Sequence, residues 1–201
     1  MKGHIGRKDI DDCMTCLKTL KKSGLLPSSN TPLRQVIVGG SHGGFITGHA
    51  IGQFPDVFDC AVARNPVLNL LAEFSSTDIP DWVLAESGLP FNWDESLCQP
   101  LKADEAAKLL EVSPVKYVCQ VKTPLQIMIG GKDRRVPMDQ SIEYFRILKN
   151  LNQHVRLLHY PDCQHSLADN VEQSTDAWCN VMAFIHHYVR GNGRRSIQST
   201  S

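Results

Sequence analysis

The sequence lacks several features that mark whole classes of protein. Its 21 basic residues balance its 21 acidic residues and neither sign forms a long run, which argues against a nucleic-acid binder and against a charged membrane-binding surface. No apolar stretch approaches the ~20 residues that span a bilayer, and the N-terminal segment MKGHIGRKDIDD has no apolar signal-peptide core. We therefore expect neither a nucleic acid nor a membrane as partner.

The seven cysteines form no disulfide framework, because their number is odd and their spacing is irregular. This use of cysteine is typical of reduced thiols in a cytoplasmic protein, and we expect that location. The pair Cys13 and Cys16 has the C-x-x-C spacing of redox and metal sites. However, the pair falls within an expected amphipathic helix and no second pair of ligands accompanies it, so we expect no metal site.

What the sequence does contain is an alternation of short apolar runs with helical patterns. The apolar runs predict parallel strands, the first of them buried; they lie at 36–38, 60–63, 125–129 and 155–160. The helical patterns lie at 9–23, 42–53, 139–151 and 174–189. In a chain of 201 residues that is 42% hydrophobic, this order predicts an α/β domain with helices on both faces of a parallel sheet.

Residues 69–117 interrupt this alternation and are interpreted as an insertion above the strand ends. They contain short helical pieces, of which 103–111 is the clearest, and turns marked by proline or glycine. Asp78 and Asp81 flank Pro80, and we interpret that segment as a turn. The segment 191–201 is polar and is predicted to be a disordered tail, which leaves 1–190 as the folded part.

The strongest functional signal is the segment VIVGGSHGG at 36–44. A strand runs into Gly-x-Ser-x-Gly and a helix follows, the pattern of a nucleophile elbow in which a sharp turn exposes the serine at the carboxyl edge of a sheet. Ser41 is therefore the predicted nucleophile. We expect Gly39 and Gly43 to be small so that the turn avoids collisions, and the backbone N–H of His42 to face a developing oxyanion.

A serine nucleophile needs a base and an acid that orients the base, and in this type of fold they follow in the order Ser, Asp or Glu, His. Asp133 is the only carboxylate in GGKDRRVP at 130–137, directly after the third apolar run. His165 ends YPDCQH at 160–165, directly after the fourth. His165 is thus the predicted base and Asp133 the residue that fixes its tautomer. The side chain of His42 is interpreted as part of the lining of the site, and the remaining histidines as structural or solvated.

With these residues placed, several blocks of the sequence resemble the acylaminoacyl peptidases (acyl-peptide hydrolases) of the prolyl oligopeptidase family. The blocks are GGSHGGF at 39–45, ARNPV at 63–67, STDIPDW at 76–82, SPVKY at 113–117, GGKDRRVP at 130–137 and YPDCQH at 160–165. The resemblance extends from about residue 3 to residue 190. It implies the α/β-hydrolase fold, of which this chain would form the second half of the parallel sheet with flanking helices.

The resemblance also implies an activity. Such enzymes are cytoplasmic serine peptidases that release an N-acylated, typically N-acetylated, amino acid from a short peptide, without a cofactor. The resemblance is compatible with a homo-oligomer of the full-length enzyme. Arg135 matches a family arginine that helps to shape the substrate site, and it can equally be interpreted as half of a surface salt bridge.

The sequence departs from the family at its front. The β-propeller domain and the first strands of the hydrolase sheet are not present in it, nor is the loop that supplies a second oxyanion donor. The strand at 36–38 is therefore expected to form an open, apolar sheet edge, which is a hazard for aggregation. Because a missing oxyanion donor typically costs ~10²–10³ in turnover, we expect little peptidase activity from these residues alone.

Two alternatives remain open from the sequence. Another serine peptidase of the same family, such as a prolyl or dipeptidyl peptidase, would carry the same nucleophile, acid and base and would differ in its substrates. A non-catalytic partner module would instead use the open strand edge to pair with a full-length subunit and regulate it.

Overall fold

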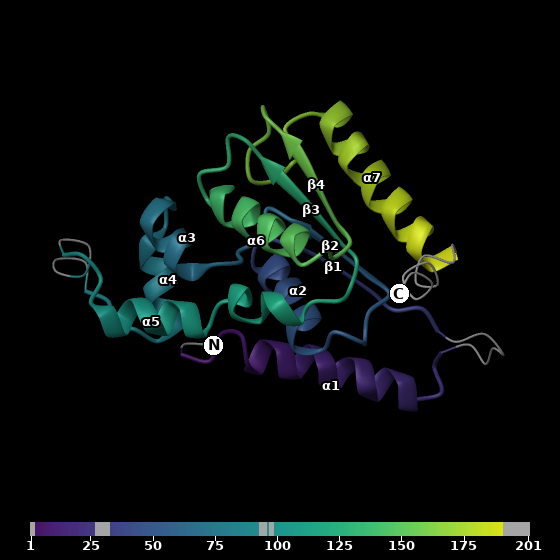
Figure 1. Ribbon diagram of the computed structural model, residues 1–201, viewed down its shortest axis with the longest axis horizontal. Coiled ribbons are helices and arrows are strands. Elements are labelled where there is room, and N and C mark those ends of the chain that lie inside the picture. Colours follow the sequence, from purple (N-terminus) through teal and green to yellow (C-terminus); the bar gives the residue numbers. More distant parts are fainter. Residues whose placement is uncertain (1–2, 27–32, 93–95, 97–98, 191–201) are drawn as a thin grey trace.

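The computed structural model describes residues 3–26, 33–92, 96 and 99–190, so the predicted tail at 191–201 lies outside the described residues. Its centre is a parallel sheet of four strands in the order β1-β2-β3-β4. The strands are β1 (Val36–Gly40), β2 (Cys60–Arg64), β3 (Leu125–Gly130) and β4 (Val155–Tyr160) (Figure 1). The predicted α/β class and all four predicted strands are confirmed.

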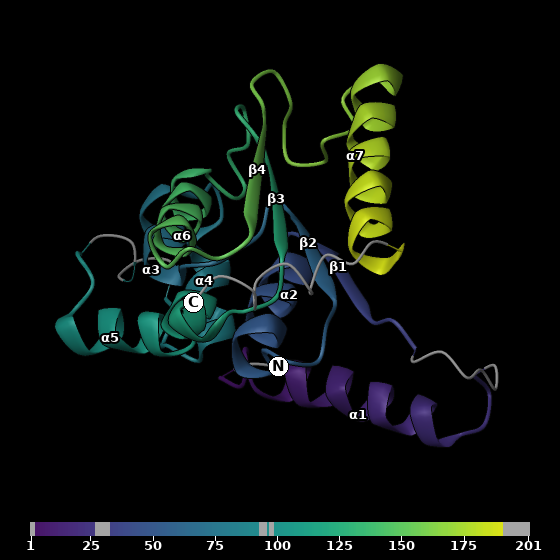
Figure 2. The ribbon, with the colours of Figure 1, turned by 45° about the vertical axis from the view of Figure 1, so that its right-hand side comes forward.

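Helices cover both faces of the sheet because alternate side chains of each strand point to opposite faces. On β3, Ile127 and Ile129 face one cluster of buried apolar residues, whereas Met128 faces the other. The first cluster contains residues of α1 (Lys8–Lys22), α2 (His42–Gln53) and α6 (Asp139–Asn150); the second contains residues of α7 (Val171–Arg190). Figure 2 shows α7 alone on its side of the sheet. Among the described residues, no helix is long and apolar enough to cross a membrane.

Strand β1 lies at one end of the sheet and has only β2 as a neighbour among the described residues. The prediction that the run at 36–38 is buried is therefore wrong: Val36 and Ile37 are half-buried, and Val38 is 42% exposed. By contrast, every residue of β3 is buried, because strands flank it on both sides. The expected open edge is thus present at β1.

The described residues of the predicted insertion form four short helices, the last of which continues to Gln120. They are α3 (Leu70–Ser76), α4 (Pro80–Ser87), α5 (Ala103–Glu111) and the 3₁₀ helix η1 (Pro114–Gln120). The turn predicted around Pro80 is wrong, because Pro80 is the first residue of α4 and Asp81 lies in its first turn. Proline suits that position, since its missing N–H would have no partner within the helix, and an aspartate there complements the helix dipole. Figure 1 shows α3, α4 and α5 grouped together beside the sheet.

Candidate active site

Ser41 occupies a strained turn between β1 and α2. Its φ is 57°, in the left-handed region that residues other than glycine rarely adopt. Three backbone hydrogen bonds hold the turn: Ser41 N–H donates to the Arg64 carbonyl at 2.9 Å, and the Ser41 carbonyl accepts from Phe45 N–H at 3.0 Å and Val67 N–H at 3.4 Å. The sheet and the first turn of α2 therefore keep Ser41 at the carboxyl end of β1, in the conformation of a nucleophile elbow.

The glycines around Ser41 differ in whether a side chain would fit at their positions. A Cβ on Gly39 would lie 2.0 Å from the carbonyl oxygen of Gly43, so this position accepts no side chain. A Cβ on Gly44 would lie 2.5 Å from Cβ of Pro66, a requirement that the sequence analysis missed. Gly43 does not have the predicted role, because a Cβ there meets nothing within 4 Å outside its chain neighbours and its own helix. The positions at which neighbouring atoms leave no room for a side chain are thus Gly39 and Gly44.

His42 contributes a backbone N–H and an imidazole to the same region. It is the first residue of α2, where backbone N–H groups have no acceptor within the helix and can face an anion. Its ring stacks on Phe45 with centroids 5.5 Å apart and meets Trp82 edge-on at 6.2 Å. Its Nε2 lies 3.6 Å from Oδ2 of the buried Asp9 on α1. These contacts fix the imidazole at the side of the elbow.

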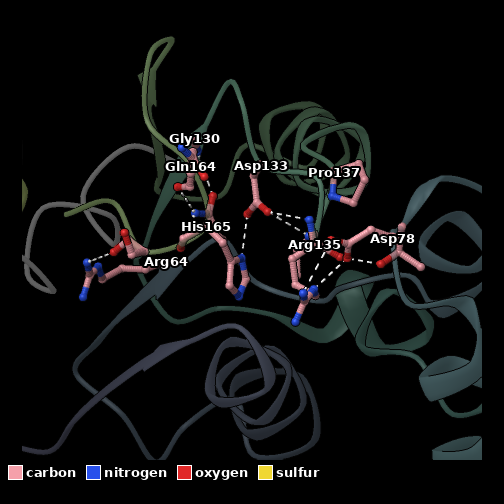
Figure 3. Close-up of polar contacts among 12 residues, drawn as sticks. Arg64, Asp78, Gly130, Asp133, Arg135, Pro137, Gln164 and His165 are labelled. Atoms are coloured by element: carbon pink, nitrogen blue, oxygen red, sulfur yellow. Dashed lines mark hydrogen bonds and ion pairs between the residues drawn. The ribbon is translucent and has the colours of Figure 1, made fainter. Parts of the chain in front are cut away.

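The loops after β3 and β4 bring Asp133 and His165 together. Oδ2 of Asp133 lies 2.7 Å from Nδ1 of His165 (Figure 3). The other carboxylate oxygen, Oδ1, accepts hydrogen bonds from the backbone N–H groups of Arg135 at 2.9 Å and Val136 at 3.0 Å. The Asp133 side chain is fully buried, whereas about a third of the His165 side chain is exposed. The carboxylate is therefore rigidly held and can orient the imidazole.

Ser41, His42 and His165 share one cavity with Arg135. Its volume is about 250 Å³, and its lining is Ser41, His42, Val67, Glu73, Ile79, Trp82, Arg135, Val136 and His165. The residues come from the ends of β1, β2, β3 and β4 and from α3 and α4, so the insertion closes the cavity from one side. The structure thus brings the predicted residues Ser41, His165 and Arg135 to one cavity, and Asp133 contacts His165 at its edge.

Arg135 forms the salt bridge considered for it and also lines the cavity. Its Nε donates to Oδ1 of Asp78 at 2.6 Å, which makes a surface salt bridge, and the residue also lines the cavity beside Ser41. The hydrogen bond from the guanidinium lowers the pKa of Asp78. Thr77 donates to the Arg135 carbonyl at 2.7 Å, so the STDIPDW segment holds Arg135 at two points.

Asn65 is a positioning residue that the sequence analysis missed. It follows β2 in a left-handed conformation, φ 39°, and is buried. Its side-chain oxygen accepts from Gly130 N–H at 2.7 Å, and its side-chain amide donates to the His165 carbonyl at 2.8 Å and the Gln164 carbonyl at 3.3 Å. It therefore ties the end of β3 to the His165 loop. The only signal in the sequence was its place within ARNPV.

Replacing Asn65 with alanine should loosen the His165 loop. The change leaves the buried Gly130 N–H without its acceptor, and an unsatisfied buried group costs roughly 1–3 kcal/mol. We expect urea denaturation to show a loss of that size and fluorophosphonate labelling of Ser41 to slow. Asn150→Ala, at an exposed position at the end of α6, is the control and should change neither. Unchanged stability in Asn65→Ala would contradict this role.

Cysteines and other metal-ligating side chains are dispersed in the described part of the chain. No three His, Cys, Asp or Glu side chains among the described residues lie close enough together to hold a metal ion. Cys13 and Cys16 are exposed on α1 and carry free thiols, as do Cys119, Cys163 and Cys179.

Known proteins resemble this chain in both sequence and fold. The model of the prolyl oligopeptidase family matches residues 1–192. Human acylamino-acid-releasing enzyme is 41% identical over 187 residues, which cover 93% of this chain and 24% of that enzyme. The rat enzyme is 39% identical over 188 residues, which cover the same shares of the two chains. An acylaminoacyl peptidase from Pyrococcus horikoshii has the same fold, with a TM-score of 0.79 at 21% identity over 95% of this chain and 29% of its own. The chain spans about a quarter of the length of the curated relatives it matches, and it belongs to the prolyl oligopeptidase family.

Proposed function

We propose that residues 1–190 form part of the catalytic domain of a serine peptidase that cleaves through Ser41, His165 and Asp133. The observation that carries this proposal is the 2.7 Å contact between Asp133 and His165 beside a cavity that Ser41 also lines. The strained elbow at Ser41 and the family membership support it independently. The exposed free thiols of Cys13, Cys16, Cys119 and Cys179 support the cytoplasmic location predicted from the sequence.

The proposed reaction is acyl transfer in two steps. His165 takes the proton of the Ser41 hydroxyl as the oxygen attacks the scissile carbonyl, and the backbone N–H of His42 stabilises the oxyanion. The intermediate collapses when His165 gives that proton to the leaving amine, which leaves an ester on Ser41. Water then attacks the ester with His165 again as base, which frees the acid and restores Ser41. Asp133 holds the tautomer of His165 throughout.

The proposed substrate is a short peptide with an N-acylated, typically N-acetylated, first residue. The support is the 41% identity to an enzyme described as acylamino-acid-releasing. In this reaction Arg135, beside Ser41 in the cavity, binds the substrate; its side chain is held by Asp78. A prolyl or dipeptidyl peptidase of the same family remains the alternative.

Aminoacyl diphenyl phosphonates test this substrate class, because they react covalently with an activated serine. We expect N-acetyl-alanyl phosphonate to label Ser41 faster than the same compound with a free amino group. Preference for a free amine or for a proline compound would instead support a sibling peptidase. Ser41→Ala is the control and should take up no probe.

The open edge of β1 favours a second candidate function, that of a non-catalytic partner module. Unpaired N–H and C=O groups on an edge strand can pair with another chain, and Val38 leaves apolar surface beside them. Absence of fluorophosphonate labelling in chain that circular dichroism shows to be folded would support this role, whereas labelling at Ser41 would support the peptidase.

A further inference from the structure

Glu73 is a buried carboxylate in the cavity that the proposed reaction does not use. It lies on α3 with 1% of its surface exposed, yet it lines the same cavity as Ser41 and His165. Buried charges in proteins are normally paired with an opposite charge. No Lys, Arg or His in the part of the chain that the structure describes lies within salt-bridge distance of Glu73.

Hydrogen bonds with Gln140 and Thr77 fix the position of the Glu73 carboxyl. Nε2 of Gln140 on α6 donates to Oε2 of Glu73. The other end of the Gln140 amide accepts from the backbone N–H groups of Leu68 at 2.7 Å and Asn69 at 3.0 Å. Gln140 is itself buried, so a rigid network holds the Glu73 carboxyl at the cavity.

Other charges around the cavity already have partners. The guanidinium of Arg135 is paired with Asp78, and His42 lies beside Asp9. Asp133 accepts three hydrogen bonds, one of them from His165. Apolar walls surround the remaining space, formed by Val67, Ile79, Trp82 and Val136. Among the described residues that line the cavity, Glu73 is thus the charged group without an ionic partner.

We propose that Glu73 is the specificity residue of this cavity and selects a substrate whose residue at the scissile carbonyl carries a basic side chain, lysine or arginine. The inference rests on the proposed function, because it assumes that Ser41 attacks that carbonyl. The stem of a lysine would lie against the apolar walls, and its ammonium would give Glu73 the missing counter-charge. An acidic group in a serine-peptidase pocket is a known way to select basic residues.

Ionisation of Glu73 gives this selectivity a pH dependence. Burial raises the pKa of Glu73 to about 7, and the neighbouring Asp133 acts in the same direction. Above that pKa the carboxylate attracts an ammonium, whereas below it the neutral acid does not, so preference for lysine should rise with pH. Among the described residues, the titratable or charged groups that line the cavity with Glu73 or act on its carboxyl are His42, Asp78, Asp133, Arg135 and His165, and Glu143 on α6 accepts from Asn69 at the start of α3.

The test compares two phosphonates that react with Ser41, N-acetyl-lysine and N-acetyl-norleucine diphenyl phosphonate, whose side chains share four carbons and differ in the terminal ammonium of lysine. We expect the 201-residue chain to react at least about tenfold faster with the lysine probe at about pH 8.5, and the ratio to approach one at about pH 5.5. Glu73→Gln keeps an acceptor for Gln140 and should bring the ratio to about one at both pH values. Glu86→Gln, which removes a charge from α4 outside the cavity lining, should leave the ratio unchanged.

The outcomes separate this inference from the function on which it rests. Equal rates with both probes at every pH, while a simple fluorophosphonate labels Ser41, would overturn the role of Glu73 and leave the peptidase proposal intact. Failure of the simple fluorophosphonate would overturn both. If Glu73→Gln does not fold, the role of Glu73 is tested instead by the pH dependence of the ratio of lysine-probe to norleucine-probe rates in the unaltered chain.

Discussion

Replacing Asp133 with asparagine is expected to slow labelling of Ser41 by a fluorophosphonate roughly 10³- to 10⁴-fold. Oδ1 of Asp133 accepts two backbone N–H groups, so the oxygen of an asparagine would stay there. Its NH₂ would then face Nδ1 of His165 in place of Oδ2. The imidazole would turn to the tautomer with its proton on Nε2, and that tautomer cannot take the proton of Ser41.

Labelling rates of purified variants at neutral pH measure this effect. Asp162→Asn is the matched control, because Asp162 is exposed on the His165 loop and pairs with Lys132 at 2.8 Å without touching the cavity around Ser41. We expect that variant to label at the unaltered rate. An Asp133→Asn chain that labels as fast as Asp162→Asn would show that Asp133 does not orient the base.

Substituting alanine at Gly39 is expected to destabilise the fold by about 3 kcal/mol or more. The added Cβ would lie 2.0 Å from the Gly43 carbonyl, and that oxygen belongs to the backbone of α2. Because neither β1 nor α2 can yield without moving Ser41, the elbow would have to open. The Gly43 carbonyl also accepts a hydrogen bond from Thr47 at 2.9 Å, which the shift would disturb.

Gly43→Ala is the control for this prediction, since its Cβ would meet nothing within 4 Å outside its chain neighbours and its own helix. Alanine is the better helix former, so the variant should be as stable as the unaltered chain or more stable by up to about 1 kcal/mol. Urea denaturation followed by circular dichroism measures both variants. Equal free energies of unfolding for the two would contradict the steric account of the elbow.

Chain order was enough to predict which residues meet at the site. Parallel strands end at one edge of a sheet, so a serine, an aspartate and a histidine that each follow a strand must lie near one another. Local pattern also located the strands and the helix at 103–111. The fold class and the contact between Asp133 and His165 follow from features that a single sequence carries.

Features that depend on contacts between distant parts of the chain could not be predicted from the local sequence. The apolar pattern of β1 is that of a buried strand, and only its place at the end of the sheet exposes Val38. Proline is common both in turns and at the first position of a helix, so Pro80 was ambiguous. The sequence of α3 gives no sign that the carboxyl of Glu73 is buried. The hydrogen bond from the Asn65 side chain to the His165 carbonyl joins residues 100 positions apart, so no local pattern predicts it.

The most direct test of the central claim is to locate the adduct that a fluorophosphonate forms on the folded 201-residue chain by mass spectrometry of its peptides. The account predicts one adduct, on Ser41, which disappears in Ser41→Ala although the circular dichroism spectrum of that variant is unchanged. No adduct on folded chain, or an adduct on another serine such as Ser166 beside His165, would contradict it.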